Sequence, residues 1–251
     1  MKKSHDVLRV VTYNIHKCRG LDRLVRPGRI LDVLRHIDAD IIALQEVLSV
    51  EGSDQERDQL RFLAAGLDCH LAFGETRLLK GGRYGNAVLS RFPIHAHRHY
   101  DLSRRGREPR GCLRTDIHVS GSTLHLFNVH FGTAFFEHRQ QARRLFEEEI
   151  VCHGELKGPR IVLGDFNEWL RGAVTRTLQS HLAHADIRHH LNKSRTYPGV
   201  LPVFHLDHIY FDDMLALERL QLHRSRPAMI ASDHLPLVAD FRLDSIRSER
   251  P

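Results

Sequence analysis

A short apolar run that ends in an acid and an amide limits most strongly what this chain can fold into. Residues 161–163 are aliphatic, Gly164 follows them, and Asp165 and Asn167 then stand two residues apart. An apolar run closed by a turn signal predicts an interior strand. Residues two apart on an extended backbone point to the same side, so the acid can take a proton from a water molecule that the amide holds. A plain strand followed by an Asp/Asn turn is the alternative for this segment alone.

The composition is that of one globular domain. The chain has 251 residues, of which 41% are hydrophobic and 27% charged, and this size favours one core over two. We therefore expect a single domain over residues 1–251. No apolar stretch is long enough for a transmembrane segment, and residues 1–6 lack the apolar run of a signal peptide. The cysteines have no paired spacing and are typical of free thiols, which favours a cytoplasmic location.

Positive charge is concentrated in one segment. The formal net charge is +6, and residues 95–114 hold six arginines against only Asp101 and Glu108. Such a segment can attract a polyanion or a phosphorylated headgroup. A solvated hairpin rim is the alternative for most of these arginines taken singly.

Runs of strand length dominate the rest of the chain. They predict strands at residues 7–13, 41–44, 69–73, 84–90, 93–100, 111–119, 123–129, 215–222 and 235–241, and helical periodicity predicts helices at residues 29–36, 55–65, 137–151 and 173–180. We expect residues 93–100 at a sheet edge and a short hairpin connection at residues 120–122. This order predicts a mixed, largely antiparallel sheet system covered by helices.

Polar residues follow or interrupt these apolar runs. They are Asn14, Glu46, Asn86, His130, Asp165, Asn167, Asp207, Asp233 and His234. Singly, each such residue is usually a cap or a turn residue. Together they predict a pocket of hard oxygen ligands with two imidazoles, which selects magnesium, manganese or calcium over zinc. A divalent ion there is suited to the attack of water on a phosphate ester.

Seven motifs make the chain similar to a known family. They are residues 12–16 (TYNIH), 44–47 (LQEV), 85–91 (GNAVLSR), 128–131 (NVHF), 164–167 (GDFN), 206–210 (LDHIY) and 232–237 (SDHLPL). In this order they resemble the endonuclease/exonuclease/phosphatase superfamily, and most of all a small bacterial subgroup with an Asn-Ile-His-Lys opening. The resemblance implies a DNase I-like α/β fold, a four-layer α/β/β/α sandwich. In it, two mostly antiparallel sheets pack face to face, with the active site at one edge.

The resemblance also implies which residues handle the metal and the water. Glu46 would be the principal ligand of Mg²⁺ or Mn²⁺, with Asn14 nearby. Asp233 is either a further ligand or the cap of the last strand. Asp165 would orient or deprotonate the attacking water, and Asn167 would fix the water or the phosphate.

The remaining motif residues would contact the phosphate ester. His234 would touch the scissile phosphate, with Asp207 holding its ring in one tautomer. His130 would be the second imidazole on the phosphate and a candidate acid for the leaving oxygen. The predicted substrate contacts are Arg110, Asn86 and Tyr84, and packing alone is the alternative for Tyr84. We assign Lys17 and Arg19 to a solvated loop and His208 to a structural role.

The superfamily contains nucleases, sphingomyelin-cleaving enzymes, inositol phosphatases and deadenylases, so fold and centre do not identify the ester. The arginine-rich segment favours DNA or RNA, and hence a phosphodiesterase or nuclease. Few aromatic residues and no separate DNA-binding motif leave a phospholipid or another small phosphodiester as the alternative. A catalytically silent scaffold that binds nucleic acid or a partner is the non-enzyme alternative. We expect a monomer.

Overall fold

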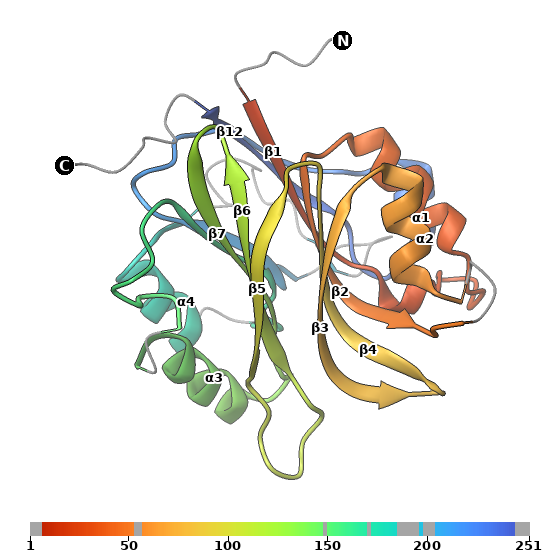
Figure 1. Cartoon of the computed structure of the whole chain (residues 1–251). Helices are drawn as coiled ribbons and strands as arrows, with labels where there is room; N and C mark the ends of the chain where they lie inside the picture. Colours follow the sequence, from red (N-terminus) through yellow and green to blue (C-terminus); the bar gives the residue numbers. More distant parts are fainter. Residues whose placement is uncertain are drawn as a thin grey trace.

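The computed structural model describes residues 7–52, 57–147, 150–169, 172–184, 196–197 and 204–243. Two six-stranded sheets pack face to face, and helices lie on the outer face of each sheet (Figure 1). The predicted four-layer sandwich is confirmed. No described helix is both long and apolar enough to span a membrane.

The first sheet has the strand order β11-β12-β1-β2-β4-β3. Its strands are β1 (Val7–Asn14), β2 (Ile41–Ser49), β3 (His70–Leu79), β4 (Gly82–Ser90), β11 (Leu217–Leu222) and β12 (Leu237–Arg242). β1 and β2 are parallel, with Asn14 opposite Gln45, and the other pairs are antiparallel. The last residues of β1 and β2 therefore lie at the same edge.

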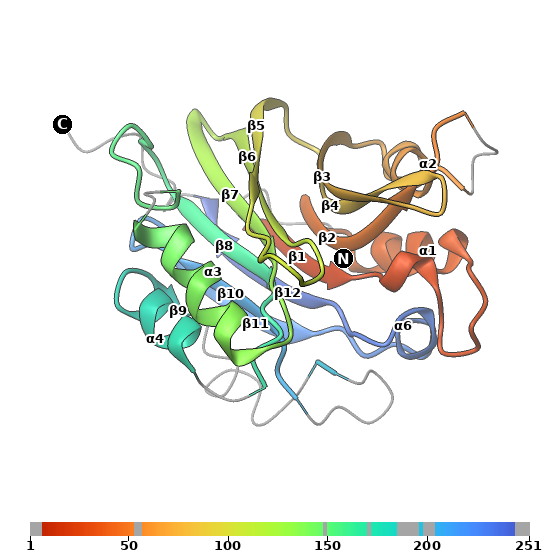
Figure 2. The ribbon, with the colours of Figure 1, turned by 90° about the horizontal axis from the view of Figure 1, so that it is seen from below.

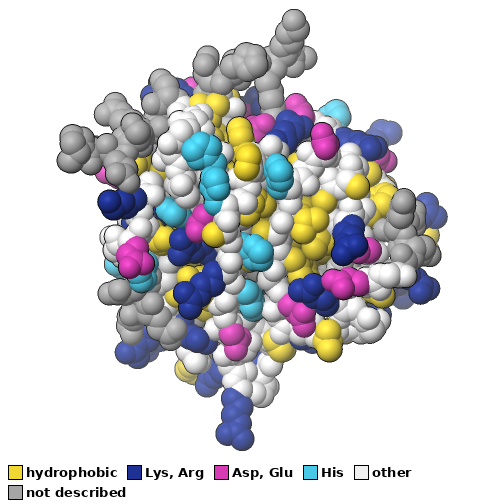
Figure 3. All heavy atoms as spheres, in the orientation of Figure 1, with side chains coloured by type: hydrophobic (Ala, Val, Ile, Leu, Met, Phe, Trp, Pro, Cys, Tyr) yellow, Lys and Arg dark blue, Asp and Glu magenta, His cyan; other side chains and the backbone are white. Residues whose placement is uncertain are grey.

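The second sheet has the order β5-β6-β7-β8-β10-β9. Its strands are β5 (Ile94–Asp101), β6 (Gly111–Val119), β7 (Ser122–His130), β8 (Arg160–Asp165), β9 (Ala183–His184) and β10 (Asp207–Phe211). β7 and β8 are the parallel pair here, with His130 opposite Asp165. β5 lies at the sheet edge as predicted. Exposed His95 and His97 make that edge polar, and Figure 3 shows histidines gathered on this face.

The described helices are η1 (His16–Cys18), α1 (Pro27–Ile37), α2 (Gln59–Leu67), α3 (Phe135–Glu147), α4 (Ala173–Gln179) and α6 (Arg226–Ala231). α1, α2 and α6 cover the first sheet, and α3 and α4 cover the second. The helix predicted at 137–151 is described as far as Glu147, and residues 150 and 151 are already in a turn; residues 148–149 lie outside the described part. The one predicted at 55–65 begins at Gln59, although residues 53–56 lie outside the described part. α6 was not predicted. Its N-terminus is capped by the Ser225 hydroxyl, which accepts from the Ala228 N–H at 3.3 Å.

Three apolar layers hold the sandwich together. Leu8, Ile41, Leu126 and Leu163 belong to the layer between the two sheets, and each is completely buried. Two further layers lie between each sheet and its helices. Because each sheet has one face on the central layer and one under helices, its central strands are buried on both faces. Their apolar runs therefore lack strict alternation.

β3 is longer than predicted. The predicted strand ended at Phe73, yet pairing with β4 continues to Leu79. A Cβ atom on Gly74 would come within 2.9 Å of the His99 ring. The glycine therefore marks a close approach of the two sheets, not the end of a strand.

Candidate active site

Two pairs of parallel strands, β1 with β2 and β7 with β8, end at the same edge of the sandwich. β1 ends in Asn14, β7 in His130 and β8 in Asp165, while Glu46 lies near the end of β2. These ends point to the bottom of Figure 1, and Figure 2 looks onto this edge. The two parallel pairs thus deliver polar groups from opposite sheets to one place.

The side-chain amide of Asn14 joins the two sheets at this edge. Asn14 Nδ2 donates to Asp165 Oδ2 at 2.9 Å and to Glu46 Oε1 at 3.3 Å. Asn14 and Asp165 are 2% and 1% exposed. Asn14 therefore fixes the relative position of two carboxylates that the sequence separates by more than a hundred residues.

Glu46 stands on a bulge of β2. Leu44 pairs with Ala87 and Val47 pairs with Gly85, so two residues of β2 oppose Asn86 alone. The backbone of Glu46 is left-handed, with φ +58°. This conformation costs a residue with a side chain about 1–3 kcal/mol, and such strain concentrates at functional sites. The bulge turns the Glu46 carboxylate toward the edge.

Asp165 and Asn167 lie in contact at the end of β8. Asn167 is also left-handed, with φ +48°, and its backbone N–H donates to Asp165 Oδ1 at 2.9 Å. Its side-chain amide donates to the Phe131 carbonyl at 3.0 Å. The turn after β8 thus holds one oxygen of Asp165, while the other oxygen faces Asn14.

His234 is paired with two buried carboxylates. Its Nδ1 lies 2.9 Å from Asp207 Oδ2, and its Nε2 lies 3.6 Å from Asp165 Oδ2. Burial opposes the charged form of the ring, but the charges of Asp207 and Asp165 outweigh it and raise the pKa of His234 to about 10. His234 is therefore a cation at neutral pH. This geometry is the one predicted for Asp207 and His234.

His130 lies at the same carboxylate with the opposite charge state. Its Nε2 is 3.7 Å from Asp165 Oδ2. Burial and the nearby charge of Arg110 lower the pKa of His130 to about 4, so the ring is neutral near pH 7. Burial also raises the pKa of Asp165 above its usual range, against the charge of His234. Two imidazoles with widely separated pKa values therefore flank one carboxylate.

Asp233 joins the cluster through its neighbour. Ser232 Oγ lies 2.8 Å from the Asn14 carbonyl and 3.3 Å from Asp233 Oδ1. The other contact of Asp233 is His16 Nδ1, at 3.4 Å. Asp233 is half-buried, so its carboxylate remains accessible at the edge.

Lys17 differs from its assignment to a solvated loop. Its ammonium forms an ion pair with Glu46 Oε2. The reason is the backbone of η1, where His16, Lys17 and Cys18 are all left-handed and the turn points back into the site. Burial favours the neutral form of Glu46, but the charges of His130 and Lys17 outweigh it and lower its pKa to about 2.

The three predicted substrate contacts are all buried. Arg110 is buried, and its guanidinium donates to Glu108 Oε2 at 2.8 Å. Tyr84 is buried beneath Lys17, whose ammonium is 5.6 Å from the ring centre. Asn86 lies between the sheets, where its amide donates to the carbonyls of Gly111 and Asn128 at 3.1 and 3.2 Å. Its donor group is thus engaged by backbone.

A buried amide pair behind the site, Gln45 and Asn128, has no role among the predicted site residues. Gln45 Nε2 donates to Asn128 Oδ1 at 2.7 Å and to Thr12 Oγ1 at 3.0 Å. Asn128 Nδ2 donates to the carbonyls of Leu44 and Ala87, both at 2.9 Å. The bonds that Asn128 makes with Gln45, Leu44 and Ala87 cross from one sheet to the other. The available signal was position, since Gln45 precedes Glu46 and Asn128 stands two residues before His130.

Aromatic residues beside His234 were also missed. The Tyr197 ring centre lies 4.9 Å from that of His234. Trp169 packs its edge against Phe204 at 4.5 Å and lies 6.1 Å from Tyr197. The signal for Trp169 was its place directly after the Gly-Asp-Phe-Asn motif. These rings form one wall of the site.

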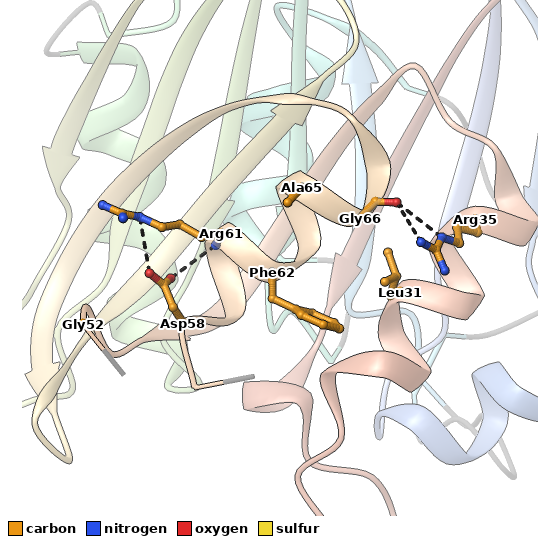
Figure 4. Close-up of a pocket in the computed structure, with 8 residues that line it drawn as sticks. All are labelled: Leu31, Arg35, Gly52, Asp58, Arg61, Phe62, Ala65 and Gly66. Carbon is orange, nitrogen blue, oxygen red and sulfur yellow. Dashed lines mark hydrogen bonds and ion pairs between the residues drawn. The ribbon is translucent and has the colours of Figure 1, made fainter. Parts of the chain in front are cut away.

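A separate pocket of about 590 Å³ opens between α1 and α2 (Figure 4). Leu31 and Phe62 line it, and Asp58 contacts Arg61 at its rim. None of the predicted site residues lines this pocket. It lies on the helical face of the first sheet, apart from the acid cluster.

Two groups of residues could hold a divalent cation. Glu46 fits best, because the positive group of Lys17 already stands against its carboxylate and its pKa keeps it ionised. Asp165, Asp207 and His234 form the other group, with ligand atoms within 4.8 Å of one another. In that group, His234 Nδ1 donates to Asp207 Oδ2 and is therefore already occupied. Hard oxygen ligands with no cysteine match Mg²⁺ or Mn²⁺.

A protein family matches most of the chain. The model of the Endonuclease/Exonuclease/phosphatase family matches residues 11–234, which include all the site residues above. The chain belongs to this family. Its members are phosphoric ester hydrolases that generally use divalent metals.

Similar proteins span nearly the whole chain. The uncharacterized protein YbhP of Escherichia coli K12 is 32% identical over 248 residues, covering 94% of this chain and 96% of YbhP. The mannosyl-6-phosphatase Bt3783 of Bacteroides thetaiotaomicron has a TM-score of 0.76 at 19% identity, covering 93% of this chain and 99% of that one. The catalytic domain of human Nocturnin has a TM-score of 0.70 at 22% identity, covering 94% of each chain. These two structures share the fold of this family member.

Proposed function

We propose that this protein hydrolyses a phosphate ester with the help of Mg²⁺ or Mn²⁺ at the edge described above. One observation carries the proposal. Asp165 is buried between His130 and His234, and the amide that binds it also binds Glu46. A base, two imidazoles and a cation ligand are thus fixed around one small volume.

Glu46 would hold the cation, with Asn14 and Asp233 beside it. When bound, the cation supplies positive charge to the phosphate oxygens as water attacks phosphorus in line with the leaving oxygen. Asp165 orients that water and accepts its proton, since its raised pKa makes it a stronger base than an exposed carboxylate. Asn167 positions Asp165 through its backbone N–H.

The two imidazoles then have different tasks. His234 is charged at neutral pH, so its Nε2–H can donate to a phosphate oxygen while Asp207 keeps Nδ1 protonated. His130 is neutral there and is therefore a poor acid. We assign the donation of a proton toward the leaving oxygen to His234, in place of the candidate role given to His130. His130 keeps its role as a phosphate contact.

The substrate side of the site carries both charge and aromatic surface. Arg104, Arg105 and Arg107 are exposed on the loop that hangs below the site, and they favour a phosphodiester polyanion such as DNA or RNA. The aromatic rings of Trp169 and Tyr197 favour instead an ester that carries an apolar group. The similar structures include a phosphatase named for a sugar phosphate. The chemistry proposed here is common to all these esters.

The experiment starts from protein stripped of metal by a chelator. Hydrolysis of bis(p-nitrophenyl) phosphate is measured with and without added Mg²⁺ or Mn²⁺, followed by plasmid DNA, short RNA and phospholipid vesicles as substrates. We expect hydrolysis that depends on the metal. No hydrolysis of any of these esters would overturn the proposal in favour of a silent binding scaffold.

A further inference from the structure

Large apolar side chains are exposed mainly around the catalytic edge. Among the described residues, those that border this edge are Leu21, Leu24, Val25, Leu78, Phe135, Phe136, Trp169 and Ile230. Leu71, at the other end of β3, is the exception. Single exposed apolar residues need no explanation, but a set that surrounds one site does. We call these eight residues the apolar rim.

One side of the rim is aromatic. Phe135 and Phe136 are 62% and 72% exposed, and they follow β7 just after His130. Their ring centres lie 6.0 Å apart. Trp169 follows β8 in the same way and connects through Tyr197 to His234. Aromatic surface therefore runs from solvent to a catalytic imidazole.

The other side of the rim is aliphatic. Leu21 N–H donates to the Ile230 carbonyl at 3.0 Å, which ties the segment after η1 to α6. Leu24 and Val25 lie in the same segment and are about half exposed. α6 leads directly into Asp233 and His234. Aliphatic groups thus border the site opposite the aromatic side.

The loops that carry or adjoin the rim are strongly basic. Residues 19–26, 76–83, 102–110 and 223–230 together hold twelve arginines and lysines against two acidic residues, Asp22 and Glu108. The rest of the chain has 25 basic and 29 acidic residues, so its net charge is negative. Figure 3 shows dark-blue side chains projecting at the bottom of the molecule, where the loop 102–110 hangs in Figure 1. These four loops therefore carry a net positive charge, in which Arg77, Arg83 and Arg110 are paired with glutamates and the other basic side chains remain for a partner.

We propose that the apolar rim and its basic loops dock on the surface of an anionic phospholipid bilayer. Exposed aromatic and aliphatic groups enter the boundary between headgroups and acyl chains, and arginines bind the anionic headgroups around them. The positive charge of the loops complements the negative headgroups, which favours an anionic bilayer over a neutral one. A nucleic acid would use the arginines but would leave Phe135, Phe136 and Leu78 in water. Docked in this way, the site faces the lipid phosphates.

Binding is measured separately from hydrolysis, so the inference can fail while the proposed chemistry holds, and the reverse. The full-length Asp165→Asn variant is sedimented with vesicles of phosphatidylcholine alone or mixed with phosphatidylglycerol. We expect binding to the anionic vesicles that weakens with added salt, and little binding to the neutral ones. No binding to the anionic vesicles, or equal binding to both, would overturn the proposal.

Two substitutions on the rim test whether its apolar side chains contribute to vesicle binding beyond the attraction of the basic loops. Phe135→Ser combined with Phe136→Ser should weaken vesicle binding about tenfold or more. Leu71→Ser, an exposed leucine away from the edge, is the matched control and should bind as before. The Phe pair should keep its hydrolysis of soluble bis(p-nitrophenyl) phosphate, which shows that it folds. If the Phe pair binds anionic vesicles as strongly as wild type, the proposal that the rim docks on lipid is overturned. The same holds if the Phe pair loses binding to DNA but keeps binding to vesicles.

Discussion

Asp207→Asn tests how the catalytic imidazole obtains its charge. Asp207 is fully buried, and its Oδ2 lies 2.9 Å from His234 Nδ1. Burial opposes the charge on His234, yet Asp207 and Asp165 raise its pKa from 6.5 to about 10. At 1.36 kcal/mol per pKa unit, a shift of this size corresponds to roughly 5 kcal/mol of free energy of unfolding.

The sign of the pH dependence follows from this raised pKa. The folded protein binds the proton on His234 more tightly than the unfolded chain does. This contribution is therefore fully present below about pH 6.5 and is lost as the pH rises through about 10. Asp207→Asn removes the negative charge that raises the pKa of His234 most. Burial, which lowers this pKa, is then opposed less, so the pKa of His234 falls. We expect the variant to be about 3–5 kcal/mol less stable at neutral pH, the usual cost of breaking a buried ion pair.

Two measurements check this prediction. NMR titration of ring-labelled histidines follows the His234 pKa, and urea unfolding at a series of pH values follows the free energy of unfolding. Asp213→Asn, which removes an exposed carboxylate beyond the other end of β10, is the control and should behave as wild type. A wild-type His234 that titrates near 6.5, or a variant with the same pH dependence as wild type, would refute the reasoning.

Three further substitutions test other parts of the site. Glu46→Gln should raise the concentration of Mg²⁺ needed for half-maximal hydrolysis by about tenfold or more, and an unchanged metal titration would remove Glu46 from the ligands. Lys17→Met should lower that concentration, because no ammonium then competes with the cation at Glu46; a higher requirement would contradict this. Gln45→Leu leaves the acceptors on Asn128 and Thr12 without a donor, so urea unfolding should show a loss of about 2–4 kcal/mol, and a loss below 1 kcal/mol would be too small for the proposed amide network.

The fold and the meeting of the motifs could be predicted because each motif residue follows a recognisable apolar run. The strand that ends in Asp165 is one example, since its aliphatic residues, its glycine and its polar end all indicate the same element. The family's motif order then implies how the strands pair. Asn14, His130 and Asp165 accordingly lie together at one edge, as the resemblance implies.

The remaining features depend on backbone conformations that residue type does not indicate. Glu46 and Lys17 are both left-handed, although neither belongs to a residue type that favours this conformation. Lys17 was therefore assigned to a solvated loop. α6 is only six residues long, too short for helical periodicity to stand out. Tyr197 and Trp169 come together with His234 through tertiary contacts between distant segments, for which a single sequence gives no signal.

The charge states of His130 and His234 could not be predicted from the sequence either. His130 and His234 are the same residue type in similar motifs, but their pKa values differ because the charge of Arg110 lies near one ring and Asp207 bonds the other. The stability contribution of His130 has the opposite sign to that of His234. Its folded pKa lies below the unfolded value of 6.5, so stability falls as the pH drops from about 6.5 through about 4.

The turnover of Asp165→Asn tests the central claim most directly. The variant keeps the shape of the side chain, and its hydrolysis of bis(p-nitrophenyl) phosphate is compared with wild type at saturating Mg²⁺ and Mn²⁺. We predict metal-dependent hydrolysis by wild type and a loss of about two to four orders of magnitude in kcat in the variant, the scale for removing a positioned base. Wild-type turnover in a correctly folded Asp165→Asn variant would show that the chemistry does not centre on this carboxylate.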